Sequence, residues 1–379
     1  MSAPRRVLVD LLGVTGNRGG TETYVRALLP RLPEHLPGSS FVALTNRVGA
    51  DLVGGLFPGD VFVQARNSGT PREWAVAAAT SVIPAARRHG ADLIWSPANF
   101  GPLRPGPVAR AVTLHDVIYH DSAGTVGVER AMRWATAQLS ARAARTADRV
   151  ITVSHAAAAD IGRRLGIDAE RIGVVHNGVA TPPAVRDARA ADLGRELGYD
   201  ASRPMILSVG NRMPHKNLPG LLRALATISA AERPVLVIPG GSEPDPLAAE
   251  AAHLGLSRDV VLPGWVSEDT LERLYAAARL YVCPSLDEGF GLPVLDALRR
   301  GTPVLANDVA VLREVGGSVA SYADATDPLR FGEAIGRELP RDDDEATRRA
   351  RREWAASFSW DAAAEATAGH LVAARNTRP

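Results

Sequence analysis

The sequence has almost no cysteine: Cys283 is the only one among 379 residues. A single thiol excludes an internal disulfide and a cysteine-based metal site. Because Cys283 ends the apolar run Leu-Tyr-Val-Cys, we expect a buried strand residue without a reactive role.

An excess of charge of one sign is also lacking, since Lys and Arg total 43 and Asp and Glu total 42. A chain without a basic field is not predicted to bind nucleic acid. Residues 1–6 lead straight into a strand and contain no apolar stretch long enough for a signal peptide or a membrane span. We therefore expect a cytoplasmic protein.

The length and composition indicate a soluble protein of two domains. A chain of 379 residues can build two cores of ordinary size. Hydrophobic residues make up 46% of the chain and charged residues 22%, within the usual range for globular proteins.

One local plan occurs twice. Residues 6–12 predict a buried strand, 13–20 a glycine-rich loop and 22–32 an amphipathic helix. About two hundred residues later, 205–209 predict a strand, 210–217 a loop and 218–229 a helix. The two copies share an architecture and not a sequence.

Apolar strands and helices alternate after each copy. Continuous Val, Ile and Leu runs between helices are typical of parallel sheets covered on both faces. The fold class is therefore α/β, with two Rossmann-like, doubly wound parallel-sheet domains. The further strands are expected at 41–45, 93–96, 111–114 and 150–153 in the first half, and at 235–238, 260–262, 280–283 and 303–306 in the second. Further helices of the second half are expected near 247–254, 270–278 and 294–300.

Two prolines in Ala180-Thr-Pro-Pro-Ala184 interrupt both patterns and place a domain boundary there. We expect an N-terminal domain over 1–181, a C-terminal domain over 182–360 and a terminal helix within 361–379. Open parallel sheets bind ligands at the carboxyl ends of their strands. Two such domains would face each other across an interdomain cleft.

The first loop could hold a phosphate, because its glycines expose N–H groups beside a helix start. A nicotinamide cofactor is the rival interpretation. It is disfavoured because the second strand ends in Ala-Leu-Thr-Asn-Arg, without the acid that would bind a ribose, and because Asn17 and Arg18 would crowd a tight dinucleotide turn.

The second loop carries Arg212, His215 and Lys216, which suit a diphosphate, although an ordinary basic surface loop fits equally well. His115-Asp116 follows a strong strand at its carboxyl end. The histidine could donate to a substrate hydroxyl or accept its proton, or the pair could cap the next turn.

Residues 286–296 place acids on both sides of a Gly-Phe-Gly turn that leads into a helix. Glu288 lies in the turn and Asp296 about one helical turn later. Pro293 suits the first turn of a helix, and the glycines let N–H groups approach a ligand. Carboxylates bind vicinal diols of sugar rings. Two ordinary helix N-terminal acids are the alternative, which the glycines disfavour.

Taken together, these motifs resemble the retaining glycosyltransferases of family 4, which have the GT-B fold. The resemblance covers nearly the whole chain, and the order of the motifs makes it specific. The matching segments are 19–25, 113–117, 147–154, 176–179, 209–217, 262–266 and 288–296.

The resemblance implies a role for each matching residue. Glu288 would contact the donor sugar, and Asp296 the ribose diol. Lys216 would bind the diphosphate, and His115 would lie near the reacting sugar carbon. The remaining donor-binding positions are Gly20 beside the diphosphate and acceptor, Trp265 and Val266 at the nucleotide base, and the backbone N–H groups of Gly289, Phe290, Gly291 and Leu292.

The chain departs from the family pattern at two positions. Asp296 stands where the family usually has the longer Glu. Asn211 directly follows the glycine of the second loop, where Arg is frequent, so Arg212 is expected to be the diphosphate cation.

The implied reaction transfers a hexose from a UDP-, GDP- or dTDP-linked donor to a hydroxyl of a glycan, a lipid-linked acceptor or a natural product, with retention and front-face attack. No cofactor is implied. No metal is implied either, because Lys216 and Arg212 would stabilise the charge of the diphosphate. The Asp342–Asp344 run is interpreted as a solvated loop or helix start and not as a metal site. The sequence fixes neither sugar nor base. The alternatives are a GT-B epimerase or phosphorylase, and a non-catalytic sugar-nucleotide-binding protein.

The acceptor is expected to touch residues 66–74 and 99–104 of the first domain. Residues 130–149 are basic and partly apolar. A plain surface helix is favoured there over peripheral contact with the inner face of a membrane.

Overall fold

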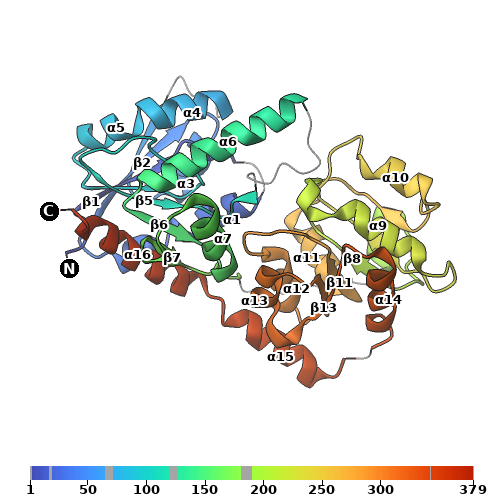
Figure 1. Ribbon diagram of the computed structural model, residues 1–379. Coiled ribbons are helices and arrows are strands. Elements are labelled where there is room, and N and C mark those ends of the chain that lie inside the picture. Colours follow the sequence, from blue (N-terminus) through green and yellow to red (C-terminus); the bar gives the residue numbers. More distant parts are fainter. Residues whose placement is uncertain are drawn as a thin grey trace. The chain divides into compact units, whose positions relative to one another are not determined.

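The computed structural model describes residues 2–16, 19–64, 71–118, 127–180, 190–341 and 343–378, without the side chains of residues 71, 72, 127–129, 132, 190 and 191. The chain forms two compact units (Figure 1). Unit 1 comprises Met1–Gly178 and Ser359–Pro379, and unit 2 comprises Val179–Phe358. The boundary expected at residues 181 and 182 lies outside the described residues.

Unit 1 is built on a parallel sheet with the strand order β3-β2-β1-β4-β5-β6-β7. The order reverses between β1 and β4, which pair directly, for example Val7 with Leu93. This reversal creates a topological switch point at their carboxyl ends. The strands are β1 (Arg6–Leu11), β2 (Ser40–Asn46), β3 (Asp60–Gln64), β4 (Leu93–Ser96), β5 (Ala109–Thr113), β6 (Arg149–Thr152) and β7 (Ile172–Val174).

Helices cover the sheet of unit 1. Buried Leu8, Leu12, Val42 and Ile94 pack against the apolar side chains of two of these helices, α4 and α5. The strands are fully apolar over several residues because neither face meets solvent. The helices are α1 (Gly20–Leu28), α2 (Leu32–His35), α3 (Ala50–Leu56), α4 (Pro71–Thr80), α5 (Val82–Arg88), α6 (Gly127–Thr146), α7 (His155–Leu165) and α16 (Trp360–Asn376).

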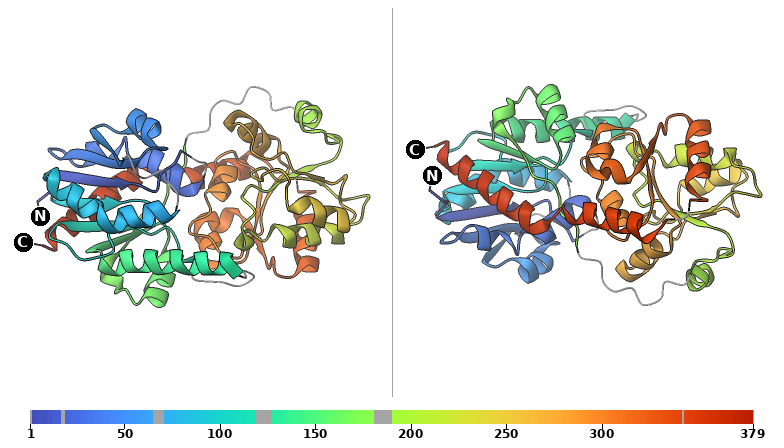
Figure 2. Two further views of the ribbon diagram at one scale, coloured as in Figure 1. Left: turned by 90° about the horizontal axis from the view of Figure 1, so that it is seen from above. Right: turned by 90° about the horizontal axis from the view of Figure 1, so that it is seen from below.

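The last helix, α16, belongs to unit 1 although it follows unit 2 in the chain. Ser359 caps it by accepting hydrogen bonds from Asp361 N and Ala362 N. The helix contacts β4, β5 and β6. The two chain ends therefore lie side by side (Figure 2), and Ser2 N donates to Asn376 Oδ1 at 3.3 Å.

Unit 2 repeats the plan with the strand order β10-β9-β8-β11-β12-β13. All pairs are parallel, and the switch point lies between β8 and β11. The strands are β8 (Met205–Leu207), β9 (Val235–Val237), β10 (Val260–Val261), β11 (Leu280–Cys283), β12 (Val304–Asn307) and β13 (Ser321–Ala323).

The core of unit 2 lies between the sheet and the helices α9, α10 and α14, where Leu221, Leu225, Phe331 and Ile335 are almost fully buried. The helices are α8 (Ala190–Leu197), α9 (Leu218–Thr227), α10 (Leu247–His253), α11 (Glu268–Ala277), α12 (Leu292–Leu298), α13 (Ala310–Gly316), α14 (Pro328–Glu338) and α15 (Glu345–Ala356). Asp344 caps α15 by accepting from Thr347 N, as its interpretation as a helix start predicts.

The prediction of two doubly wound parallel sheets is confirmed, and the predicted strands 93–96 and 280–283 match β4 and β11 residue for residue. Three strands, β3, β7 and β13, lack a counterpart in the prediction. Within the described part of the chain, no helix has both the length and the apolar character that a membrane span requires.

Candidate functional site

Lys216 and Glu288 meet at the switch point of unit 2. Lys216 lies in the loop after β8, and Glu288 lies in the turn after β11. The amine Nζ is 2.6 Å from Glu288 Oε1, and both side chains are largely buried. The backbone also joins the two loops, since Leu286 N donates to His215 O at 2.7 Å. Two residues that are 72 positions apart thus form one charged pair at the ligand-binding edge of the sheet.

The pair keeps Glu288 ionised. Burial raises the pKa of the Glu288 carboxyl, but the charge and hydrogen bond of Lys216, with a further hydrogen bond from Ser285, lower it more, so the net pKa is below the ordinary value. The acid is therefore a carboxylate at neutral pH. A buried carboxylate can accept hydrogen bonds from hydroxyl groups of a sugar.

The glycine turn after Glu288 leads into α12. Gly291 caps the helix with φ of 101°, a left-handed conformation that favours glycine. A Cβ at this position would also lie 3.0 Å from Leu312 Cδ2. Pro293 lies in the first turn of α12, as predicted. Phe290 is buried against Phe358, with 5.9 Å between ring centroids, so its side chain anchors the turn.

Asp296 lies on α12 in a second charged cluster. Arg299 Nε donates to Asp296 Oδ1 at 2.9 Å, while Arg299 Nη1 donates to Ala180 O at 3.1 Å. Arg299 also pairs with Glu272 of α11. Burial raises the pKa of Asp296, and Arg299 opposes this shift. About one third of the Asp296 side chain is exposed, whereas Arg299 is nearly buried.

Arg212 has a different environment from the one expected for a diphosphate cation. Its Nε and Nη2 donate to the Asp245 carboxylate, Nη1 to Gly210 O and Nη2 also to Ile238 O. Both charged side chains are about nine-tenths buried. The guanidinium therefore ties the loop after β8 to the end of β9 and to the segment around Asp245.

The other donor positions of unit 2 lie in loops after β8 and β10. Asn211 is exposed, and its Oδ1 accepts a hydrogen bond from Met213 N at 3.2 Å. Trp265 is 56% exposed and Val266 follows it. Their loop is joined to the one after β9, because Gly240 N donates to Gly264 O at 2.8 Å.

In unit 1, Gly20 is the first residue of α1. Glu22, two residues later, accepts from Thr15 N at 2.9 Å and from Gly16 N at 3.0 Å through the same oxygen, Oε1. The N–H groups of Thr15 and Gly16 belong to the loop that the sequence predicted to hold a phosphate. In the structure they donate to a carboxylate of the following helix. Asn17 and Arg18 lie outside the described residues.

His115 is buried after β5. Its Nε2 lies 2.9 Å from Pro97 O, and its backbone N donates to Asn99 Oδ1 at 2.7 Å. Because a carbonyl only accepts, Nε2 carries the proton and Nδ1 the lone pair. The ring packs edge-on against Tyr24, with 4.7 Å between centroids. Burial lowers the pKa of His115 to about 4, so the imidazole is neutral near pH 7.

Sequence reasoning missed Asp10, the next-to-last residue of β1, at the switch point of unit 1. Ser96 Oγ, at the end of β4, donates to Asp10 Oδ2 at 3.0 Å. Burial raises the pKa of Asp10 to about 6, although Ser96 and Leu12 N lower it in part. A lone Asp inside Val-Leu-Val-Asp-Leu-Leu was the available signal, since an acid in a buried strand is unusual.

The two segments expected to contact an acceptor meet in unit 1. Trp74 packs against Phe100, with 4.0 Å between ring centroids. Both rings are partly exposed. Gly13, in the loop after β1, lies under Trp74, because a Cβ there would be 2.5 Å from the indole. Residues 65–70 are outside the described part.

Comparison with known families assigns each half of the chain. Residues 18–181 match the family described as Glycosyltransferase Family 4. Residues 192–325 match the family described as Glycosyl transferases group 1.

Curated relatives carry related names. The O-antigen chain mannosyltransferase RfbU of Salmonella typhimurium is 28% identical over 186 residues, which are 49% of either chain. The O-antigen chain mannosyltransferase B of Escherichia coli is 37% identical over 41% of this chain and 42% of its own. The MMP alpha-(1->4)-mannosyltransferase of Mycolicibacterium hassiacum is 30% identical over 67% of this chain and 63% of its own. The chain thus spans about half of the length of the first two relatives and less than two thirds of the third.

Solved structures show the same fold. A glycosyltransferase from Rickettsia africae has a TM-score of 0.71 at 15% identity, covering 97% of this chain and 98% of its own. WaaG, a glycosyltransferase involved in lipopolysaccharide biosynthesis, has a TM-score of 0.68 at 17% identity, covering 93% and 95%. HepE of Anabaena, in complex with UDP-glucose, has a TM-score of 0.65 at 20% identity, covering 99% and 98%. With both halves assigned and the fold shared, the chain belongs to the family 4 type of glycosyltransferases and has the GT-B architecture.

Proposed function

We propose that the protein transfers a hexose from a nucleotide-diphosphate sugar to an acceptor hydroxyl, with retention of configuration and without a metal ion. The observation that carries this proposal is the buried Lys216–Glu288 pair at the switch point of unit 2, directly before the glycine turn into α12. A cation, a carboxylate and a run of N–H groups at one strand edge suit a diphosphate joined to a polyol.

Unit 2 would bind the donor. Lys216 and the N–H groups of the 289–292 turn would hold the diphosphate, which the positive end of α12 also favours. Glu288 would accept from sugar hydroxyls. Asp296 would bind the ribose diol while Arg299 fixes its carboxylate, and Trp265 and Val266 would contact the base.

Arg212 takes a revised role in this proposal. Its guanidinium donates to Asp245 and to two backbone carbonyls. A diphosphate would have to compete with a buried carboxylate that already has near-ideal bidentate geometry. We therefore propose that Arg212 positions the 210–217 loop, and that Lys216 is the cation of this loop that binds the diphosphate.

The chemistry would proceed at the front face of the sugar. As the bond between the anomeric carbon and the diphosphate oxygen breaks, the acceptor oxygen would attack from the same side, and its proton would pass to the departing phosphate oxygen. Lys216 would stabilise the charge that develops on the diphosphate. His115, neutral with its proton on Nε2, would contribute shape and a neutral acceptor at Nδ1. The protein's contribution is then mainly positioning.

The names of the relatives support a proposal for the donor and acceptor classes. Several carry the name mannosyltransferase, two of them acting on an O-antigen chain. One structural neighbour is described with UDP-glucose. We propose a hexosyl donor and a glycan, lipid-linked or small-molecule hydroxyl acceptor.

A binding screen followed by turnover tests the proposal. Melting temperatures would be measured with UDP, GDP, dTDP and ADP, because a ligand of the folded state raises the transition. The matching hexose donors would then be incubated with hydroxyl acceptors with and without EDTA, and the anomeric configuration of the product would be read by NMR. Retained configuration at an unchanged rate in EDTA supports the proposal. Binding without transfer or hydrolysis supports a sugar-nucleotide-binding protein, and a rearranged donor sugar supports an epimerase.

A further inference from the structure

The connection between β4 and β5, residues 97–108, contains no helix. Parallel strands are usually joined through a helix, which satisfies its own backbone groups. An extended crossover must find other partners for its carbonyls where it is buried. We call residues 97–108 the crossover strap.

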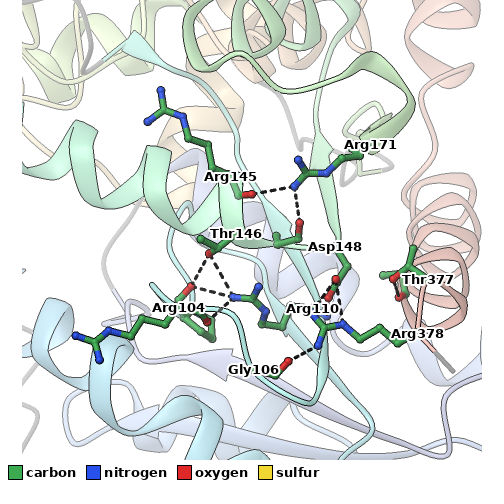
Figure 3. Close-up of polar contacts among 12 residues, drawn as sticks. Arg104, Gly106, Arg110, Arg145, Thr146, Asp148, Arg171, Thr377 and Arg378 are labelled. Carbon is green, nitrogen blue, oxygen red and sulfur yellow. Dashed lines mark hydrogen bonds and ion pairs between the residues drawn. The ribbon is translucent and has the colours of Figure 1, made fainter.

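Side chains from β5, from α6 and from the end of the chain donate to carbonyls of the strap between Pro102 and Gly106. Arg110 of β5 donates through Nη1 to Pro102 O at 3.3 Å and to Arg104 O at 2.9 Å (Figure 3). Arg110 is 1% exposed, so its guanidinium donates to these carbonyls from the interior. The others are Arg142 Nε to Leu103 O at 2.9 Å, Thr146 Oγ1 to Pro102 O at 3.3 Å, and Arg378 Nη1 to Gly106 O.

Arg378 ties this arrangement to the end of the chain. It follows α16, and its Nε and Nη2 donate to Asp148 Oδ1 at 3.0 and 2.9 Å. The other oxygen of Asp148 accepts from Arg110 N at 2.8 Å. Figure 3 shows Arg110, Asp148 and Arg378 around one end of the strap. Arg378, near the end of the chain, thus supports the crossover strap, which lies in the first half of the sequence.

The other end of the strap holds His115. Pro97 O accepts from His115 Nε2, and Asn99 Oδ1 accepts from His115 N. Asn99 adopts a left-handed conformation with φ of 64°, and its own N donates to Thr113 O at 3.0 Å. Backbone strain of this kind persists where surrounding bonds fix it.

The middle of the strap lies directly on the end of β4. A Cβ on Gly101 would be 2.8 Å from Ser96 Oγ and 3.0 Å from Val112 Cγ2. The neighbouring residue, Phe100, packs on Trp74. A displacement of the strap would therefore move both the aromatic pair and the partners of His115.

We propose that the crossover strap is a positioning element for acceptor binding, fixed at its far end by the arginine donors of β5, α6 and the chain terminus. This inference rests on the proposed function, in which unit 1 binds the acceptor. Arg110, Arg142 and Arg378 act through the strap carbonyls and are positioning residues. Donor binding depends on unit 2 and does not depend on the strap.

The test compares Arg378→Met and Arg142→Met with Arg171→Met in the full chain. Arg171 also donates to two carbonyls, Arg145 O and Ala147 O, but neither belongs to the strap. We expect the two strap variants to raise amide hydrogen exchange in peptides covering 97–118 at least ~5-fold through local opening. Amide hydrogen exchange in peptides of unit 2 should stay within ~2-fold of the parent rate. Arg378→Lys should restore part of the protection, because an amine can still donate.

Turnover gives the second readout. In the strap variants, KM for the acceptor should rise at least ~5-fold, while KM for the donor and the melting shift with nucleotide stay unchanged. Arg171→Met should change neither constant. A rise of both KM values together, or unchanged exchange in 97–118, would overturn the positioning role.

A third readout does not need turnover. Burial lowers the pKa of His115 to about 4, and the hydrogen bond to Pro97 O of the strap offsets only part of this shift, so entry of water would raise the pKa. In Arg378→Met, NMR should show the His115 pKa moving toward its ordinary value as the strap loosens. If the pKa shifts in this way but the parent protein shows no transfer activity, the proposed function is refuted, whereas the role of the strap in positioning His115 is supported. An unchanged His115 pKa in both strap variants would refute the positioning role of the strap.

Discussion

The amine of Lys216 lies 2.6 Å from the Glu288 carboxylate, across the two neighbouring strands where the sheet of unit 2 reverses its order. The pair is largely buried, so each charge depends on the other. Under the proposed function, the two groups would bind chemically different parts of a nucleotide sugar. The lysine suits the diphosphate, and the carboxylate suits the hydroxyl groups.

Replacing Glu288 by Ala should abolish transfer, by at least ~10²-fold in kcat, because the donor sugar would lose its carboxylate contact. Lys216→Met should instead weaken nucleotide binding and reduce the melting shift with nucleotide diphosphate. Either variant removes one charge of a largely buried pair, so the melting temperature of the protein alone must be measured as a control. A Glu288→Ala protein that transfers at the parent rate would refute the assigned role.

Arg212→Met should destabilise unit 2 by roughly 3–5 kcal/mol, because it leaves Asp245 buried without its partner. Urea unfolding measures this loss. The variant with Arg212→Met and Asp245→Leu together should recover most of it, since removing both charges removes the desolvation cost. Surface arginines such as Arg163, whose side chain is 70% exposed beside Asp160, serve as controls and should change stability by less than ~1 kcal/mol. A large loss of nucleotide affinity without any loss of stability would restore Arg212 as the diphosphate cation.

The sequence was informative where continuous apolar runs define buried strands, and β4 and β11 were predicted to the residue. The strand β3 was missed because it lies at the edge of its sheet. Phe62 and Val63 are 38% and 46% exposed there, so the segment lacks the signature of a strand buried on both faces.

The candidate site was likewise only partly predictable from the sequence. Glu288 and Lys216 were predicted from motifs, but their pairing depends on the adjacency of β8 and β11, which follows from the strand order. The partner of Arg212 lies in Ser-Glu-Pro-Asp, a stretch that contains no motif. Local sequence therefore indicates which side chains are present in the loops. It does not decide whether a cation is used for a ligand or for a buried acid.

Asp296→Glu should leave transfer equal to the parent or improve it. The Asp296 side chain is one third exposed, and the longer acid keeps the negative charge that pairs with Arg299. Kinetic constants for donor and acceptor measure the effect, with Asp296→Asn as the control that removes the charge and should raise KM for the donor. A severe loss in Asp296→Glu would mean that the shorter acid matches a different donor geometry.

His115 should not produce an ionisation near pH 6.5 in the rate profile, because its pKa in the folded protein is about 4. The folded pKa is below the unfolded one, so the neutral form stabilises the fold above pH ~6.5 and this contribution is lost as the pH falls through 4. The full loss in the free energy of unfolding is about 3 kcal/mol. NMR of ¹⁵N-labelled histidine should show the proton on Nε2 between pH 6 and 8. A His115 signal that titrates near 6.5 would contradict the buried environment.

Asp10→Asn should become progressively more stable than the parent as the pH rises from 4 to 7. Burial raises the folded pKa of Asp10 to about 6. Below the unfolded pKa both states carry the proton and the fold has no penalty, whereas above pH 6 the parent must hold a buried carboxylate that Ser96 and Leu12 N satisfy only in part. The two-unit shift corresponds to a relative change of about 3 kcal/mol in the free energy of unfolding, measured by urea unfolding at each pH.

Asp92→Asn is the matched control with the opposite sign. Although burial alone would raise it, the pKa of Asp92 is lowered by the backbone N–H groups of Arg6 and Arg5 and by Arg375. This variant should therefore lose stability relative to the parent as the pH rises through the folded pKa toward about 4, and should show almost no further change between pH 4 and 7. If Asp10→Asn gains no more stability over the parent between pH 4 and 7 than Asp92→Asn does, Asp10 is not buried in the way that the fold of unit 1 requires.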